Sequence, residues 1–499
     1  MSNKTGKTFI GVSITIFFSK LLGFVREIVF ASVFGTTVLT DMFQVVFSYP
    51  SLFFSSIGTA LSAVNIPDLT FFITQRSKEE RNQYLANLFA QVTLIATIIT
   101  ILGIIFAPAL TRIIAPGFSA EVTHLAVLLT RIMMPTLLFV SLTFLTAGVL
   151  QVHQYFLISA SISIPFNMLI IGSLLWKGSD LVFLGYVTTL GWLLQFLIQL
   201  PVLIREKYHW RFNLQWSDPY IRNTFKSILP ILLGNSLLQL CLIIDRSFAT
   251  HLSPGTASSL AFGSNLFVTI TSVFIVAMAT VVFPRLSQYC LDLDFGHIRL
   301  LLGQVFKMLL FILLPYLLLV VCYHQQIIAL VYQRGAFGAD STAMTSLAFF
   351  FYSFAVLGYL CQEVYNRVFY ALKRYKIPML ASGGCIMLNL ALDYILFRSG
   401  GIIGLSLSTA ATMLLYAIIM SVMLTREIGA FINRDLIVYL IKLLFPSLAM
   451  LGVVWGFRLS GIGTGPGLGF LLPLLGSMVI YLGVAFVLGL FKVFFLKEV

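Results

Sequence analysis

The stretch SKLLGFVREIVFASVFGTTVLTDMF, residues 19–43, is long and apolar, yet it carries Lys20, Arg26, Glu27 and Asp41. A helix needs about 20 apolar residues to cross the hydrocarbon core of a bilayer, and comparable segments recur along this chain of 499 residues. Charged residues make up only 10% of the sequence, against about one quarter in an average soluble domain. The sequence therefore predicts an all-α polytopic membrane protein, since a transmembrane barrel would show alternating segments of about ten residues.

Charge clusters and Gly/Pro turns divide the chain into about fourteen candidate transmembrane helices. Their predicted centres lie near residues 20, 56, 96, 137, 165, 192, 236, 270, 312, 358, 387, 413, 446 and 481. The first segment keeps its charges and lacks a small-residue cleavage site, so we expect a retained helix and not a signal peptide.

The basic residues predict the orientation of these helices. With the N-terminus inside, nineteen of the 31 Lys and Arg residues fall in ends and connections on the cytoplasmic side, and five fall on the outer side. The five are Arg112, Lys177, Arg334, Arg398 and Arg458. By the positive-inside rule both termini are cytoplasmic. The same rule accounts for the net charge of +13, so we expect no nucleic-acid partner.

Two halves of the sequence resemble each other. REIVFASVFGT (26–36) parallels DRSFATHLSPGT (245–256), at an offset of about 220 residues. An even number of spans per repeat gives both repeats the same orientation, as in transporters built from parallel repeats. The sequence thus predicts an N-lobe over residues 1–215, a C-lobe over 216–430, and two extra helices over 431–499.

Seven basic residues lie in or at the edge of predicted spans: Lys20, Arg26, Arg131, Arg246, Lys307, Arg367 and Lys442. A charge at mid-bilayer costs about 2.5–3.5 kcal/mol, so such residues indicate a polar cavity or close pairing. One interpretation is a cationic pocket for a phosphate or diphosphate, with bidentate contacts from Arg26 and a point charge from Lys20. The other is a helix end where Arg26 pairs with Glu27. On an ideal helix Lys20 and Arg26 point about 120° apart, so convergence requires a bend, for which Gly23 is the candidate.

A second group of polar residues comprises Asp245, Asn389, Asp393 and Thr409. Asn389 and Asp393 are four residues apart and share a helix face. Carboxylate, amide and hydroxyl oxygens suit a hard cation such as Na⁺, and intramembrane carboxylates suit a proton relay. The alternative is that Asp245 pairs with Arg246 and Asn389 caps a broken helix.

Enzymatic motifs are weak. The six histidines show no metal-binding spacing, and the five cysteines are odd in number and mostly sit in apolar runs, as buried small hydrophobes do. Asp292-Leu-Asp294 matches a short metal and nucleotide-sugar motif of glycosyltransferases, but a solvated acidic loop is the simpler interpretation. We therefore expect a transporter with no cofactor.

Several motifs resemble the MurJ/MviN family of lipid II flippases, within the multidrug/oligosaccharidyl-lipid/polysaccharide exporter superfamily. They are SKLLGFVRE and TDMF near the N-terminus, IIDRSFATHLSPGTASSL (243–260), LVYQRGAFGADST (330–342), RVFYALKRYKIP (367–378) and GLSLSTAA (404–411). The resemblance implies two six-helix lobes around a central cationic cavity and a lipid-tail groove on the last two helices. It implies a cargo of undecaprenyl-diphosphate-linked peptidoglycan precursor, moved from the cytoplasmic to the outer leaflet of the bacterial plasma membrane. Membrane lipids and the cell-wall synthesis machinery are the further partners it suggests.

The resemblance also assigns roles to residues. Arg26 and Lys20 match cavity cations and Asp41 matches the acidic residue at the outer end of the first helix. Arg246 and Asn265 complete the predicted substrate-binding set. Asp245, Asn389, Asp393 and Thr409 resemble a sodium site of some members.

The sequence departs from the family pattern at three places. Phe54 and Ser55 stand near an arginine pair of the second helix, IGTA (57–60) reduces an acidic-Gly motif, and Asn265 stands where a basic residue is common. A flippase for another polyprenyl-linked glycan is therefore an alternative, as is a cation-coupled drug exporter of the same superfamily. The exporter would favour an anionic or aromatic cavity over Lys20 and Arg26. A scaffold protein of wall synthesis would tolerate loss of these charges.

Transport is expected to proceed by alternating access. The membrane potential is worth about 2.3 kcal/mol per charge per 100 mV, so it would pull an emptied cationic cavity back toward the cytoplasm. Coupling to Na⁺ or H⁺ would require different affinities for the ion in the two states.

Overall fold

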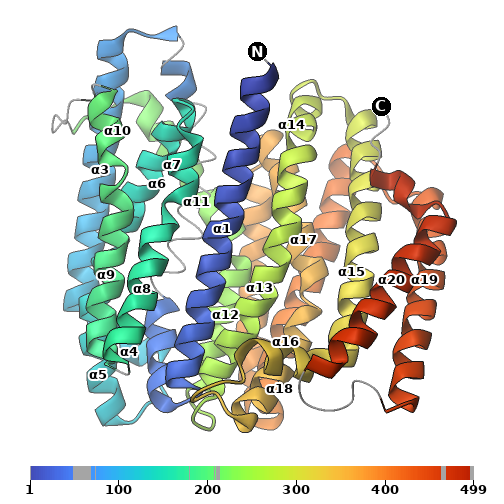
Figure 1. The fold of residues 1–499 in the computed structure, drawn as a ribbon. Helices are drawn as coiled ribbons and strands as arrows, with labels where there is room; N and C mark the ends of the chain where they lie inside the picture. The colour runs from blue at the N-terminus through green and yellow to red at the C-terminus, as the bar shows by residue number, and fades with distance from the viewer. Residues whose placement is uncertain are drawn as a thin grey trace. The chain divides into compact units, whose positions relative to one another are not determined.

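The computed structural model describes residues 2–48, 69–72, 75–178, 180–206, 208, 214–461 and 468–494. Within these ranges the regular secondary structure is helical and includes no strand, which confirms the predicted all-α class. The chain forms two compact units, Met1–Ser258 with Gly335–Phe337, and Ser259–Arg334 with Gly338–Val499. Figure 1 shows the helices in chain order by colour.

The first unit is built from long helices and short connecting helices. They are α1 (Ser2–Phe34), the helix Val38–Ser48, α3 (Lys78–Ile105), α4 (Ala107–Ile114), α5 (Ala120–Met133), α6 (Thr136–Val152), α7 (Phe156–Ser161), α8 (Ser163–Lys177), α9 (Leu181–Leu197), α10 (Leu200–Arg205), α11 (Pro219–Asn235) and α12 (Leu237–Ala249).

The second unit begins within α13 (Thr256–Val281) and contains the longest helices. They are α14 (Phe283–Leu291), α15 (Phe295–Tyr332), α16 (Ala339–Ser353), α17 (Val356–Ala371), α18 (Lys376–Ile428), α19 (Arg434–Leu459), α20 (Leu471–Val487) and the 3₁₀ turns η1 (Leu468–Phe470) and η2 (Leu490–Phe494).

Seven of the described helical segments are long and apolar enough to cross a membrane, and two bent helix pairs would bring the number to nine. The seven are Lys78–Ile105, Ala120–Val152, Phe156–Lys177, Leu181–Arg205, Phe295–Tyr332, Lys376–Ile428 and Arg434–Leu459. The bent pairs are α11 with α12, at 56°, and α16 with α17, at 45°. The total of fourteen spans and the boundaries 1–215, 216–430 and 431–499 stay predictions. The span predicted near residue 56 lies outside the described residues.

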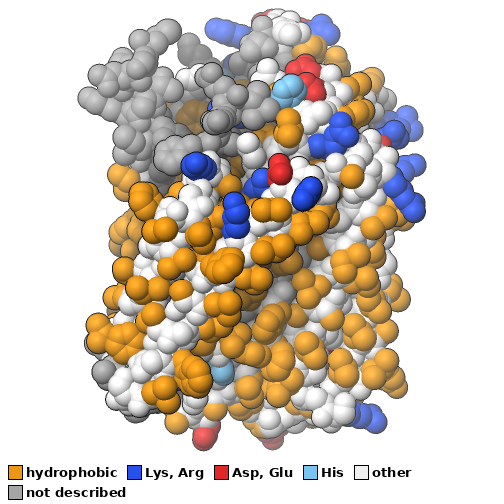
Figure 2. Space-filling model, turned by 90° about the vertical axis from the view of Figure 1, so that its right-hand side faces the viewer, with side chains coloured by type: hydrophobic (Ala, Val, Ile, Leu, Met, Phe, Trp, Pro, Cys, Tyr) orange, Lys and Arg blue, Asp and Glu red, His pale blue; other side chains and the backbone are white. Residues whose placement is uncertain are grey.

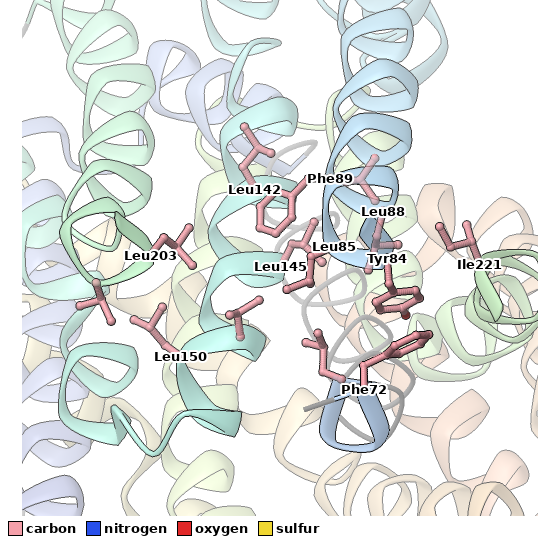
Figure 3. Packing of buried hydrophobic residues seen from close by; sticks show 14 residues of the cluster. Phe72, Tyr84, Leu85, Leu88, Phe89, Leu142, Leu145, Leu150, Leu203 and Ile221 are labelled. Carbon is pink, nitrogen blue, oxygen red and sulfur yellow. The ribbon is translucent and has the colours of Figure 1, made fainter. Parts of the chain in front are cut away.

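A hydrophobic cluster joins α3 to α6 in the first unit. Figure 3 shows Leu142 and Leu145 of α6 pointing toward Leu85 and Phe89 of α3. Beside them the Phe72 ring stacks on Tyr84, with centroids 4.3 Å apart. The cluster packs the N-terminal half of α3 against α6.

In the second unit, α15 packs against α19 and α20 around Phe311, Tyr439 and Tyr481 (Figure 1). On the face drawn in Figure 2, hydrophobic side chains cover a broad band, and Lys and Arg gather mainly above it. An apolar band of this kind is what contact with lipid tails requires.

Helix α18 is in fact two helices joined at Gly401, whose φ of +53° lies in the left-handed region that glycine tolerates. After this break, Gly404 packs so closely on Leu396 that a Cβ would lie 2.5 Å from its carbonyl oxygen. The two segments of α18 therefore fold back on each other.

Candidate functional site

Helix α1 packs on α8 through small and polar residues. The Ser19 and Ser163 hydroxyls are 2.6 Å apart, and a Cβ on Gly23 would lie 3.7 Å from the Asn167 amide. One turn further, the Arg26 guanidinium lies over the Phe166 ring, 5.3 Å from its centroid. Small residues let the helix backbones approach, so the side chain of Arg26 lies against α8 rather than pointing away from it.

Arg26 forms an ion pair with Glu27, at 2.6 Å between Nη2 and Oε1. Both side chains are largely buried, at 19% and 17% exposed. The pair borders a cavity of about 30 Å³ lined by Arg26, Glu27, Phe30, Phe43, Gln44, Phe47, Phe166, Ile170, Leu184 and Thr188. That volume admits one or two waters and is too small for a lipid headgroup. The structure thus shows the local ion pair of one interpretation beside a small cavity, and the phosphate pocket of the other interpretation stays a prediction.

Lys20 is exposed and does not line this cavity. Helix α1 runs without a break from Ser2 to Phe34, and Gly23 lies next to Asn167. The bend at Gly23 that convergence of Lys20 with Arg26 would require stays a prediction. A substrate contact at Lys20 stays a prediction.

Asp41 is buried, and its carboxylate accepts hydrogen bonds from the backbone amides of Gly255 and Ser258, at 2.7 and 2.6 Å. These amides lie at the start of α13, where the first N–H groups of a helix have no partner within the helix. Asp41 therefore caps α13 and adds a negative charge at its positive end. The substrate-binding role predicted for Asp41 stays a prediction.

Arg246 lies on α12 and is buried, and its Nη1 donates to the Ser48 hydroxyl at 3.0 Å. Asp245 precedes it and is fully buried. Asn265 lies half-buried on α13 in the second unit. Phe54, Ser55 and residues 57–60 lie outside the described residues.

The fold-back of α18 brings the predicted ion-site residues of the second unit together. The Asn389 amide donates to the hydroxyls of Ser408 and Thr409, both at 3.2 Å, and the Ser408 hydroxyl donates to the Asp393 carboxylate. All four side chains are buried. Ser408 was not predicted as a member of this site. Ser408 and Asp393 lie at nearly equal distances along the chain on either side of Gly401, so the fold-back brings them together.

The Asn389 side-chain oxygen is buried without a hydrogen-bond partner, while the amide nitrogen of the same side chain donates to the hydroxyls of Ser408 and Thr409. Amide, hydroxyl and carboxylate oxygens are of the type that binds small hard cations. Among the residues that the structure describes, no group of three or more His, Cys, Asp or Glu side chains could hold a metal ion. Asp245 of the predicted ion site lies on α12 in the first unit.

Asp294 of the acidic loop has a structural role. Its carboxylate accepts from the backbone N–H of His297 at 3.1 Å and caps α15. This bond, together with the His297 side chain, holds the pKa of Asp294 below its usual range. The capping bond accounts for the residue without a metal.

A polar network closes the turn between α6 and α7. His153 Nε2 lies 2.5 Å from the Tyr208 hydroxyl, and the Tyr155 hydroxyl donates to Glu206 at 2.7 Å. Arg81 lies over the Tyr208 ring, 4.5 Å from its centroid. Burial lowers the pKa of His153, while Glu206 acts in the opposite direction.

Comparison with known proteins gives consistent matches. A family model described as Lipid II flippase MurJ matches residues 30–474. A probable lipid II flippase MurJ of Buchnera aphidicola subsp. Acyrthosiphon pisum is 27% identical over 457 residues, covering 90% of this chain and 89% of the relative. The lipid II flippase MurJ of Burkholderia cenocepacia is 26% identical over 402 residues, covering 78% of both.

Solved structures agree in fold. A lipid II flippase MurJ in an inward closed conformation matches with a TM-score of 0.80 at 24% identity, covering 96% of this chain and 98% of that one. An inward-facing multidrug resistance MATE family transporter matches with a TM-score of 0.67 at 14% identity, covering 85% and 98%. Because the family model spans most of the sequence, the resemblance seen in the motifs is confirmed: this chain is a membrane protein of the lipid II flippase MurJ family.

Proposed function

We propose that this protein is a flippase, not an enzyme, which carries undecaprenyl-diphosphate-linked peptidoglycan precursor from the cytoplasmic to the outer leaflet. Membership of the family supports the cargo. The observation that carries the mechanism is Arg26, a largely buried cation on α1 that borders a cavity.

Glu27 acts as an exchangeable counter-ion in this proposal. While the cavity is narrow, Glu27 neutralises Arg26 and lowers the cost of burying a cation. A diphosphate carries more charge than one carboxylate and presents paired oxygens to the guanidinium fork, so it can replace Glu27 when the cavity widens. Alternating access then moves the headgroup outward while the polyprenyl tail remains in lipid.

Coupling to Na⁺ or H⁺ is proposed at Asn389, Asp393, Ser408 and Thr409, with Asp245 as a further candidate. The oxygens of this cluster would supply a cation with a partly anionic shell, and a proton could instead rest on Asp393. Binding drives transport only when the ion's affinity differs between the two states.

The remaining parts of the proposal follow from charge distribution and the family. Both termini are assigned to the cytoplasm by the positive-inside rule. The pair α19 and α20 is assigned to the lipid tail, residues 1–215 and 216–430 to the two lobes, and wall-synthesis proteins are assigned as partners.

Depletion of the protein in its host tests the cargo. Accumulation of lipid II on the inner leaflet, measured by leaflet-specific labelling, is the expected result. Accumulation of another polyprenyl-linked glycan would redirect the assignment to that glycan. Normal lipid distribution combined with lost efflux of lipophilic cations would replace the flippase by a drug exporter.

A further inference from the structure

The backbone hydrogen-bond pattern of helix α15 is broken at two places along its length. Pro315 lies inside the helix, and Tyr323 has non-helical backbone angles of φ −136° and ψ 18°. Each break leaves backbone groups without their usual partner four residues away. Within a membrane such groups must find another partner, because lipid offers none.

At the first break the partner comes from α20. Pro315 has no N–H, so the carbonyl of Phe311, four residues earlier, loses its helical donor. The Tyr481 hydroxyl donates to this carbonyl at 2.7 Å. Tyr481 is fully buried, and its ring lies 5.5 Å from the Phe311 ring.

At the second break the partner comes from α19. Arg458 Nη2 donates to the carbonyl of Cys322 at 2.5 Å, next to the non-helical Tyr323. The Arg458 guanidinium also lies over the Tyr323 ring, 5.8 Å from its centroid. Tyr323 packs against Phe470, which leads into α20.

We propose that Tyr481 and Arg458 are positioning residues. Through their hydrogen bonds to α15, Tyr481 holds α20 and Arg458 holds α19 at the two breaks, so that the three helices move as one body. Separation of α20 from α15 would expose the unpaired Phe311 carbonyl to hydrocarbon. Separation of two helices that share only apolar contacts would expose no unpaired polar group. Any tilt of α15 would thus carry with it the apolar faces that α19 and α20 present to lipid. The inference is independent of the cargo.

Tyr481→Phe tests the hydrogen bond between α20 and the Phe311 carbonyl, with Tyr439→Phe as the matched control. Tyr439 belongs to the same buried cluster, but its hydroxyl donates at 3.3 Å to Leu490 and not to α15. We expect amide hydrogen exchange in α20 to become about tenfold faster in Tyr481→Phe than in Tyr439→Phe, because a buried acceptor is left unpaired. Spin labels on the exposed Val321 and Val479 should report a broader distance distribution in Tyr481→Phe but not in Tyr439→Phe.

A double-variant cycle isolates the proline. Pro315→Ala restores the N–H that bonds to the Phe311 carbonyl, so adding Tyr481→Phe in that background should accelerate exchange less than twofold. Arg458→Ala removes the hydrogen bond between α19 and the Cys322 carbonyl, and the Arg458 side chain is exposed. This variant should broaden the same distance distribution even if Tyr481→Phe does not fold. Equal exchange in Tyr481→Phe and Tyr439→Phe, an undiminished effect in the Pro315→Ala background, or an unchanged distribution in Arg458→Ala would overturn the inference.

Discussion

Two buried polar sites of this protein differ in the groups that surround their charged residue. In the first unit, Arg26 pairs with its sequence neighbour Glu27 and borders a cavity. In the second unit, Asp393 and Asn389 sit among hydroxyls on the folded-back α18, where hydrogen bonds run from amide to hydroxyl to carboxylate.

The difference is the reason for proposing a different ligand at each site. A cation whose partner is one carboxylate beside a cavity can exchange that partner for a larger anion. A carboxylate among hydroxyl and amide oxygens offers an acceptor-rich shell to a cation or a proton. Glu27 compensates the charge of Arg26 in low dielectric, where an unpaired charge would cost several kcal/mol, whereas Asp393 accepts a hydrogen bond from the neutral Ser408 hydroxyl.

The largest effect should come from the cation. Arg26→Ala is expected to lower lipid II flipping in proteoliposomes at least 100-fold, because the diphosphate loses its bidentate partner. Arg26→Lys keeps the charge but loses the fork, and should fall between. Arg131→Ala, on the exposed face of α5, is the control and should retain activity. Flipping at the native rate by Arg26→Ala would remove the residue from the mechanism.

The anionic site should respond to ions instead of to cargo. Asp393→Asn preserves shape and removes the charge, so we expect about a tenfold lower rate and loss of any dependence on Na⁺ or pH. Flipping measured under imposed Na⁺ and pH gradients checks this. A variant that keeps the full ion dependence would show that the cluster is structural only.

Asp41 sharpens the contrast between a functional and a structural charge. Asp41→Asn can still accept one of the two backbone hydrogen bonds at the start of α13, so we expect a loss of about 1–2 kcal/mol in unfolding free energy. Thermal unfolding of the purified protein measures it. An unchanged melting temperature in Asp41→Asn would contradict its role as the cap of α13.

The smallest effect concerns pH. The pKa of His153 lies below its ordinary value of 6.5, so below that pH the unfolded chain binds more protons than the folded one. The stability contributed by the turn network is therefore present above pH 6.5 and is lost as pH falls through the lowered pKa. Local hydrogen exchange at the α6–α7 turn should accelerate on acidification, and His153→Gln should remove that dependence. Equal acceleration in the variant would assign the effect to another group.

Much of the fold is readable from the sequence because lipid imposes a simple rule. The apolar runs of α3, α15 and α19 predict helices by length alone. The hydrogen bond from the Tyr481 hydroxyl to the Phe311 carbonyl depends on how the helices pack, and no periodicity in the sequence predicts it.

The candidate sites were predictable only in part. Arg26 stands out as a charge in an apolar run, but its pairing with Glu27 and its exposure to a cavity were left open between two interpretations. Ser408 escaped notice because hydroxyls are unremarkable in membrane helices, and only the reversal at Gly401 brings it to Asp393.

Equilibrium binding of undecaprenyl diphosphate to the purified protein tests the central claim most directly. Relative to the native protein, Arg26→Ala should bind at least about tenfold more weakly, since hydrogen bonds to charged groups contribute about 1.5–3 kcal/mol. Glu27→Gln should bind as tightly or more tightly, because it releases Arg26 from its internal partner. Native affinity in Arg26→Ala, or weakened binding in Glu27→Gln to the level of Arg26→Ala, would contradict the exchange of Glu27 for the diphosphate.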